Sequence, residues 1–106
     1  MTEEDTFPIH ARVEPALISL GIVPANKFKR KVFNLVMNEH SGADNYLALV
    51  FVHGGVTSAM QINIGAYDTI DIPKEKVASI EADPNTEIKV SARATSIDVL
   101  MVCKDI

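Results

Sequence analysis

The sequence predicts an all-β protein, an antiparallel β-sandwich or jelly-roll-like barrel of about six to eight short strands. Apolar and polar residues alternate in several short runs after residue 26, and turn signals separate these runs. The 106 residues, 47 % of them hydrophobic, are enough for one core and too few for two. We expect an extended N-terminal arm with a short helix over residues 1–26 and the sandwich domain over residues 27–106.

The N-terminal segment differs from the rest of the chain because three prolines interrupt it. A short helix is predicted over residues 14–21, since Pro15 suits the first helical position and Gly21 suits the position past the end. So short a helix needs a packing partner. The segment therefore either packs across its own domain or anchors on a neighbour. The residues of this assembly-arm hypothesis are Phe7, Ile9, Val13, Leu17, Ile18, Ile22 and Val23.

Four runs alternate with a period of two, the mark of a strand with one buried face. They cover residues 31–37, 60–64, 69–72 and 87–94. In the clearest of them, Ile88 and Val90 point to one side while Lys89 points to the other.

Two further strands, residues 46–53 and 97–104, are apolar on both faces. A strand of this kind is covered on both sides by other parts of the chain or by a neighbouring subunit. The residues predicted to form the apolar second face are Val50, Val52, Leu100 and Val102.

Turn signals lie between the predicted strands, at residues 41–45, 53–55, 65–66 and 83–85. Gly54-Gly55 predicts a hairpin turn that needs positive φ. Residues 73–80 fit one turn of helix as well as a short strand, so both interpretations stay open.

Residues whose side chains could take part in catalysis or metal binding are few and isolated. His40, with Glu39 and Asp44 nearby, is typical of a solvated loop more than of a metal site. His53 ends an apolar strand, and Cys103 has the spacing of a small buried hydrophobe. We therefore predict no catalytic residue, no metal site, no cofactor and no enzymatic activity.

Lys27, Lys29 and Lys31 would share one face of a strand and could contact an acidic protein partner. The formal net charge of −4 disfavours a nucleic-acid partner. The longest apolar run is far shorter than the roughly 20 residues that cross a bilayer, so no membrane is expected as a partner.

The layout of residues 27–104 resembles that of a known family. Val32-Phe33-Asn34-Leu35-Val36-Met37-Asn38 is followed by Ser41-Gly42 and by an aliphatic strand ending in Gly54-Gly55, and Thr86-Glu87-Ile88-Lys89-Val90-Ser91-Ala92 leads into Ile97-Asp98-Val99. This pattern resembles the small β-sandwich accessory proteins of tailed-bacteriophage virions, which serve as capsid decoration (cement) proteins or as neck and tail appendages.

The resemblance implies a non-enzymatic virion structural protein, a capsid decoration subunit that attaches through its N-terminal arm and apolar sheet faces. Its implied partners are the major capsid protein or neck and tail proteins, with homo-oligomerisation, in a virion assembled in the host cytoplasm. Two alternatives stay open. One is a phage neck, tail or fibre component, and the other is a glycan- or receptor-binding module, for which Tyr46 and Tyr67 lie near turns.

Overall fold

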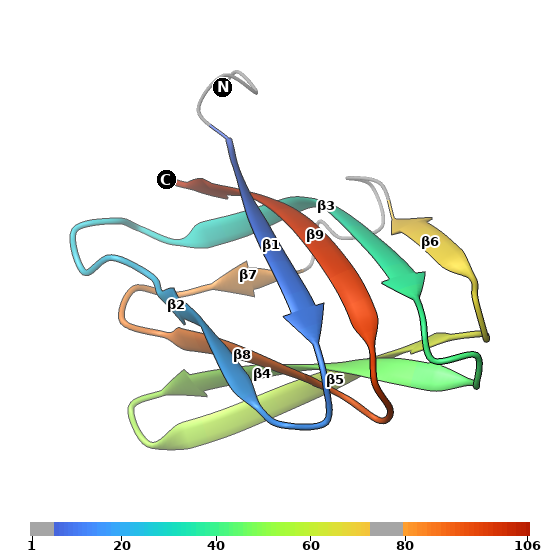
Figure 1. Ribbon diagram of the computed structural model, residues 1–106. Coiled ribbons are helices and arrows are strands. Elements are labelled where there is room, and N and C mark those ends of the chain that lie inside the picture. The colour runs from blue at the N-terminus through green and yellow to red at the C-terminus, as the bar shows by residue number, and fades with distance from the viewer. Residues whose placement is uncertain (1–5, 73–79) are drawn as a thin grey trace.

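Two antiparallel sheets pack face to face in the computed structural model, which describes residues 6–72 and 80–106 (Figure 1). The first sheet has the order β1-β9-β3-β6, with β7 also paired to β3, and the second has the order β2-β8-β4-β5. The strands are β1 (Phe7–Val13), β2 (Ile18–Ile22), β3 (Arg30–Glu39), β4 (Asn45–His53), β5 (Val56–Ile64), β6 (Thr69–Ile72), β7 (Glu81–Ala82), β8 (Glu87–Ala92) and β9 (Ile97–Asp105).

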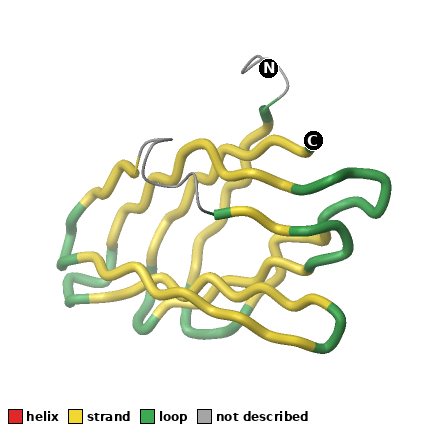
Figure 2. Tube along the Cα trace, turned by 180° about the vertical axis from the view of Figure 1, so that it is seen from behind, coloured by secondary structure: helices red, strands yellow, loops and turns green. Residues whose placement is uncertain are grey.

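The fold class is therefore all-β and sandwich-like, as predicted. In Figure 2 the described chain consists only of strands and loops. Each of the six predicted strand regions coincides with or overlaps an observed strand, and the predicted turns lie between them. The structure describes nine strands, more than the predicted number, because β1, β2 and the two-residue β7 were not expected.

The predicted N-terminal arm with a helix is not supported. Residues 7–13 form β1 along β9, and residues 18–22 form β2 along β8. The helix was wrong because so short a helix would leave most of its backbone groups without partners. The free edge of β8 offers those partners instead. Pro8 is compatible with β1 because a strand at the edge of a sheet needs hydrogen bonds on one side only.

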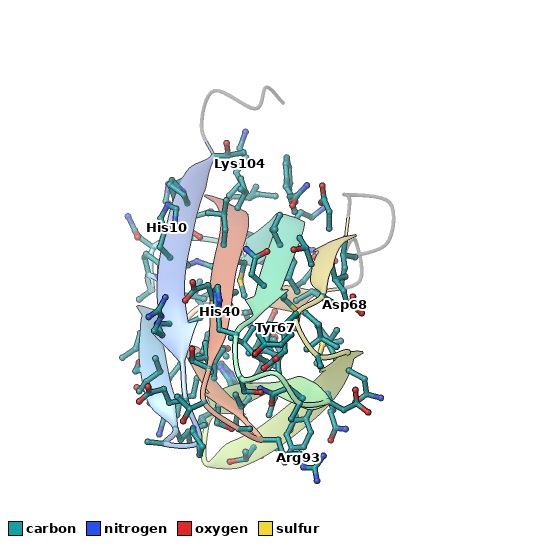
Figure 3. The ribbon with its side chains drawn as sticks, turned by 45° about the vertical axis from the view of Figure 1, so that its right-hand side comes forward. His10, His40, Tyr67, Asp68, Arg93 and Lys104 are labelled. Carbon is teal, nitrogen blue, oxygen red and sulfur yellow. The ribbon has the colours of Figure 1, made fainter. Side chains whose placement is uncertain are left out.

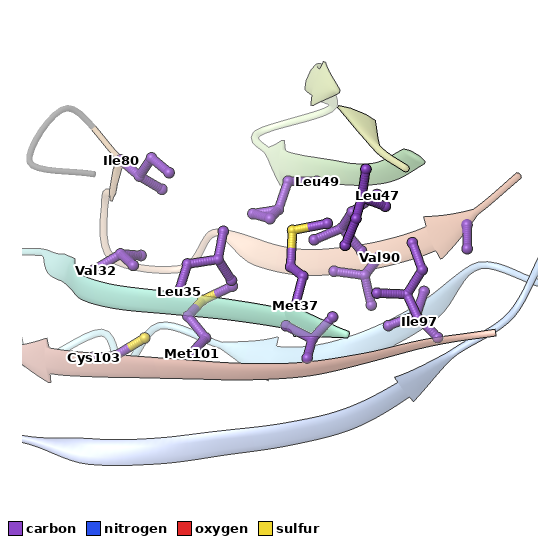
Figure 4. Packing of buried hydrophobic residues seen from close by; sticks show 14 residues of the cluster. Val32, Leu35, Met37, Leu47, Leu49, Ile80, Val90, Ile97, Met101 and Cys103 are labelled. Carbon is purple, nitrogen blue, oxygen red and sulfur yellow. The ribbon is translucent and has the colours of Figure 1, made fainter. Parts of the chain in front are cut away.

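The core lies between the two sheets (Figure 4). β3 contributes Leu35 and Met37, and β4 contributes Leu47 and Leu49, all four completely buried. The alternation predicted from the sequence places these side chains inward, because successive residues of a strand point to opposite faces. Burial of such side chains is the main stabilising contribution to the fold.

The β4–β5 hairpin has the most regular pairing in the second sheet. Its register runs without a shift from Asn45↔Ile64 to His53↔Val56. Gly54 and Gly55 form the turn, with φ of 57° and 81°. This confirms the predicted hairpin turn, because a two-residue turn of this type needs positive φ at both positions.

Five described strands lie at sheet edges: β1, β6 and the two-residue β7 in the first sheet, and β2 and β5 in the second. Of the ambiguous segment 73–80, only Ile80 falls within the described residues, and its side chain is buried. No described segment forms a helix long and apolar enough to cross a membrane.

Candidate functional site

His40 joins a charged cluster on the outer side of the first sheet (Figure 3). Its Nε2 lies 2.8 Å from Oδ2 of Asp98, and Arg12 donates to both oxygens of the same carboxylate, at 2.8 and 3.0 Å. The hydrogen bond from Arg12 is the main reason that the pKa of Asp98 lies below its usual value. The cluster ties β1, β9 and the end of β3 together.

Glu39 holds the loop that follows β3. Its carboxylate accepts hydrogen bonds from the backbone N–H groups of Ser41 and Gly42 and from the side-chain amide of Asn45, at 2.9–3.0 Å. Burial alone would raise the pKa of Glu39, but these hydrogen bonds outweigh it and lower the pKa from 4.5 to about 2. Glu39 is therefore a structural anchor, and Asn45 is held in place by the same contacts.

The predicted basic face is divided between different environments. β3 begins only at Arg30, so Lys27 and Lys29 precede the strand. Lys29 pairs with Glu81 at 2.7 Å, and Lys27 is exposed. Arg30 belongs to the same basic run but was not assigned to the predicted face. It forms an ion pair with Asp105 through two hydrogen bonds, at 2.7 and 3.1 Å, in a nearly buried position.

The predicted assembly-arm residues fall into two groups. Val13 and Val23 are fully buried in this chain, and Phe7 and Ile9 are partly buried and pack against the main core cluster. The other three are exposed and lie on β2 or just before it: Leu17 at 51 %, Ile18 at 38 % and Ile22 at 60 %. β2 and the residue before it therefore expose three large apolar side chains to solvent.

The predicted second-face residues lie on inner strands of the two sheets. Val50 and Val52 are on β4, Leu100 and Val102 are on β9, and all four are half-buried. Neighbouring strands shield their flanks, which explains why they are less exposed than the residues of β2.

The opposite edge of the second sheet is also apolar, which sequence reasoning missed. On β5, Val56 is 66 % exposed and Met60 is 39 % exposed. An open depression of about 260 Å³ separates this end of β5 from residues of and around β7. It is lined by Phe51, His53, Val56, Ser58, Glu81, Ala82, Asp83 and Thr86.

A larger depression, of about 660 Å³, lies at the other end of the β4–β5 hairpin. Tyr46, Gln61, Asn63 and Arg93 line it together with Asp68, and Arg93 and Asp68 are visible in Figure 3. Of these lining residues, the sequence prediction named only Tyr46 for glycan binding. The alternation of residues 60–64 did place Gln61 and Asn63 on one face, but it gave no sign of Arg93.

The remaining single groups, His53 and Cys103, lie apart from these clusters. His53 Nδ1 lies 3.1 Å from the hydroxyl of Thr86, and the thiol of Cys103 is buried, which raises its pKa to about 11. Within residues 6–72 and 80–106, no three His, Cys, Asp or Glu side chains are grouped so that they could hold a metal ion.

No family model matches this sequence, and no curated protein matches it. Among solved structures, a protein of the Bacillus endospore appendages, described as disulfide-linked pili, is similar with a TM-score of 0.53 and 10 % identity. The match covers 96 % of this chain and 86 % of that one. At this identity the likeness shows a shared fold and nothing further.

Two other solved structures have lower scores. A pentameric capsid protein from metagenomic phage sequences has a TM-score of 0.46 and 11 % identity, with 93 % of this chain and 62 % of that chain covered. A mitogen of Yersinia pseudotuberculosis has a TM-score of 0.41 and 15 % identity, with 93 % and 85 % covered.

Proposed function

We propose that this chain is a non-enzymatic structural subunit of a bacteriophage virion, a capsid decoration subunit that attaches to the particle through the edge of β2. The observation that carries the proposal is the exposure of Leu17, Ile18 and Ile22 on or next to this edge strand. These residues belong to the segment that the sequence marks as an assembly arm.

The position of these residues suits attachment to a larger surface. β2 has a neighbour on one side only, so no other strand covers its open edge. A partner that covers the three residues would bury apolar surface.

The resemblance to phage accessory proteins supplies the partner in this proposal, the major capsid protein or a neck or tail protein. Lys27 lies in the loop soon after the end of β2 and is exposed, so it can contact an acidic patch on that partner. Val13 and Val23 act in the proposal only by holding β1 and the chain after β2 in place.

The test begins with virions purified from the source of this chain, in which mass spectrometry should find the protein in many copies per particle. Stripped particles are then mixed with the purified protein, and the bound fraction is measured by co-sedimentation. Replacing Leu17 and Ile22 together by Ser should weaken attachment about tenfold or more, since each apolar anchor contributes about 1 kcal/mol.

Phe28→Ser is the matched control, because Phe28 is 72 % exposed but lies in the loop after β2. It should attach like the wild type. Absence of the chain from virions, or equal attachment of the Leu17/Ile22 double variant, would contradict the proposal. Deleting residues 1–26 is not a suitable test, because the deletion removes both β1 and β2 from the sandwich.

A second candidate function, glycan binding, is favoured by the larger depression. Tyr46 offers an aromatic ring, and Gln61, Asn63 and Arg93 offer hydrogen-bonding groups around the same open space. Such a combination suits a sugar, which presents hydroxyl groups at its rim and C–H groups on its faces.

A glycan array with the wild-type protein tests this candidate. Binding that disappears in Tyr46→Ala and in Arg93→Ala, and persists in Val56→Ala at the opposite end of the hairpin, would support it. An array without any bound glycan would remove it.

A further inference from the structure

The edge strands β1, β2, β5 and β6 differ in how well they resist pairing with another chain. β1 carries Pro8 and Arg12, and β6 has only four residues and carries Asp71. β2 has a shift in register between Ser19 and Ile22. Short edges, charges, prolines and irregular pairing are the features that keep natural edge strands from joining.

β5 has none of these features. It spans nine residues, Val56–Ile64, without a charged residue or a proline, and it pairs with β4 without interruption. Its first six residues are all exposed. A long, regular and uncharged edge strand is a template for pairing with a further strand.

The chain segment that contains β5 is also free of charged residues, although Glu81 and Asp83 line the depression beside Val56 and Ser58. Residues 45–67, which contain all of β4 and β5, include no Asp, Glu, Lys or Arg, although these types make up 23 % of the chain. Two copies of this protein, each with a net charge of −4, repel one another in most relative orientations. The β4–β5 hairpin is the longest stretch of the sequence that contributes no formal charge to that repulsion.

The sequence of β5 is compatible with pairing to itself. An antiparallel pair centred on Met60 places Val56 opposite Ile64 and leaves Met60 opposite its own copy. On the outer face, the same register places Thr57 opposite Asn63 and Ala59 opposite Gln61. On the inner side Val56 meets Ile64 and Met60 meets its own copy, while Ser58 lies opposite Ile62, and no like charges face each other.

We infer that the edge of β5 is a self-association surface, where β5 of a second copy pairs antiparallel about a two-fold axis at Met60. The two second sheets then form one continuous sheet of twice the width. Val56 and Met60, exposed in the single chain, gain apolar neighbours in the dimer. The inference goes beyond the proposed attachment to a particle, which uses β2 on the opposite edge of the same sheet.

Light scattering on the full-length protein is the first part of the test. The wild type should have twice the 11.6 kDa mass of one chain. Met60→Lys should reduce it to a single chain, because two lysines would face each other at the axis. Met60→Glu should do the same, and an equimolar mixture of the two variants should regain the dimer mass. His10→Lys, which adds the same charge to the exposed edge strand β1, should leave the dimer intact.

Cysteine cross-linking fixes the register and does not depend on charge. Met60→Cys places two thiols directly opposite each other, so mild oxidation with diamide should give a covalent dimer. In Thr57→Cys the two thiols would lie about 20 Å apart along the strands, so no cross-link should form. The native Cys103 is buried and does not interfere.

A wild type that stays a single chain at every concentration would overturn the inference. So would a dimer that survives Met60→Lys in folded form, or Thr57→Cys cross-linking as fast as Met60→Cys. Circular dichroism of each variant shows whether it is folded, and the cysteine variants decide the matter if Met60→Lys does not fold.

Discussion

The first and second sheets share one apolar core, but they differ in where the molecule places its charged groups. In the first sheet, Arg12 with Asp98, Arg30 with Asp105, and Lys29 with Glu81 connect segments that are far apart in the sequence. In the described part of the second sheet, the one ion pair joins Lys89 to Glu87 on the same strand, at 3.7 Å.

One small sandwich can therefore have a side closed by ion pairs and a side open to association. Paired charges between strands favour one register and make an edge costly to cover, because covering them removes water from charged groups. The β4–β5 hairpin lacks such groups and can lose its water at little cost. Substitutions in the core, in the ion pairs and in the loop after β3 test this contrast.

Core residues of the first and second sheets should contribute equally to the free energy of unfolding. Leu35→Ala in β3 and Leu49→Ala in β4 each remove a completely buried side chain. Each should lower the free energy of unfolding by about 2–5 kcal/mol, through lost burial and the cavity left behind. Urea denaturation measures both. A large loss for one variant and almost none for the other would show that the two sheets do not share one core.

The buried ion pair should matter far more than the exposed one. Arg30→Met leaves the carboxylate of Asp105 nearly buried without its partner and should cost about 3 kcal/mol. The Arg30 guanidinium also lies 5.0 Å from the centre of the Phe7 ring, a contact that the variant loses. Arg12→Met, whose side chain is 64 % exposed, should have a much smaller effect. Similar losses in the two variants, measured by urea denaturation, would contradict this ranking.

A side chain at Gly42, in the loop after β3, should destabilise the fold. A Cβ there would lie 2.6 Å from the hydroxyl oxygen of Tyr67, and the backbone has φ of +79°. Gly42→Ala should therefore destabilise the fold by about 1–3 kcal/mol in thermal denaturation. Gly54→Ala, in the hairpin turn with open space around it and φ of +57°, should cost less. An equal cost would mean that Tyr67 moves aside freely.

The contribution of Glu39 to stability should be lost only at acidic pH. Its pKa is lowered from 4.5 in the unfolded chain to about 2 in the folded one. The stability that it contributes is thus fully present above pH 4.5 and is lost as the pH falls towards 2. Glu39→Gln should flatten this part of the stability curve, measured by urea denaturation between pH 5 and pH 2, the two sides of this window. An unchanged slope in the variant would show that another carboxylate is responsible.

The regular strands could be predicted because their signal is local. Residues 69–72 are predicted and observed as the same strand, and residues 87–92 alternate in the sequence as they do in β8. β1 also has a period of two, in Phe7, Ile9, Ala11 and Val13, but Pro8 hides it. A proline is compatible with a strand at the edge of a sheet but not with one at its centre. β1 could therefore be predicted only if its position at the edge were known.

The candidate surfaces could be predicted only in part. Leu17, Ile18 and Ile22 are apolar in the sequence, but the pairing of β2 with β8 decides that they stay exposed while Val23 is buried. His40 was considered with its sequence neighbour Asp44, whereas it contacts Asp98, 58 residues away. That contact follows from the alignment of β3 with β9, which no local pattern reveals.

The all-β class, the alternation that fills the core, and the glycine turn between β4 and β5 follow from local sequence patterns alone. These depend on the preferences of a few neighbouring residues, and such preferences are present in any conformation of the chain. The tertiary structure alone decided which strands lie at the edges and which charges meet. Those features depend on contacts between distant segments, whose free energy exists only once both sheets have formed.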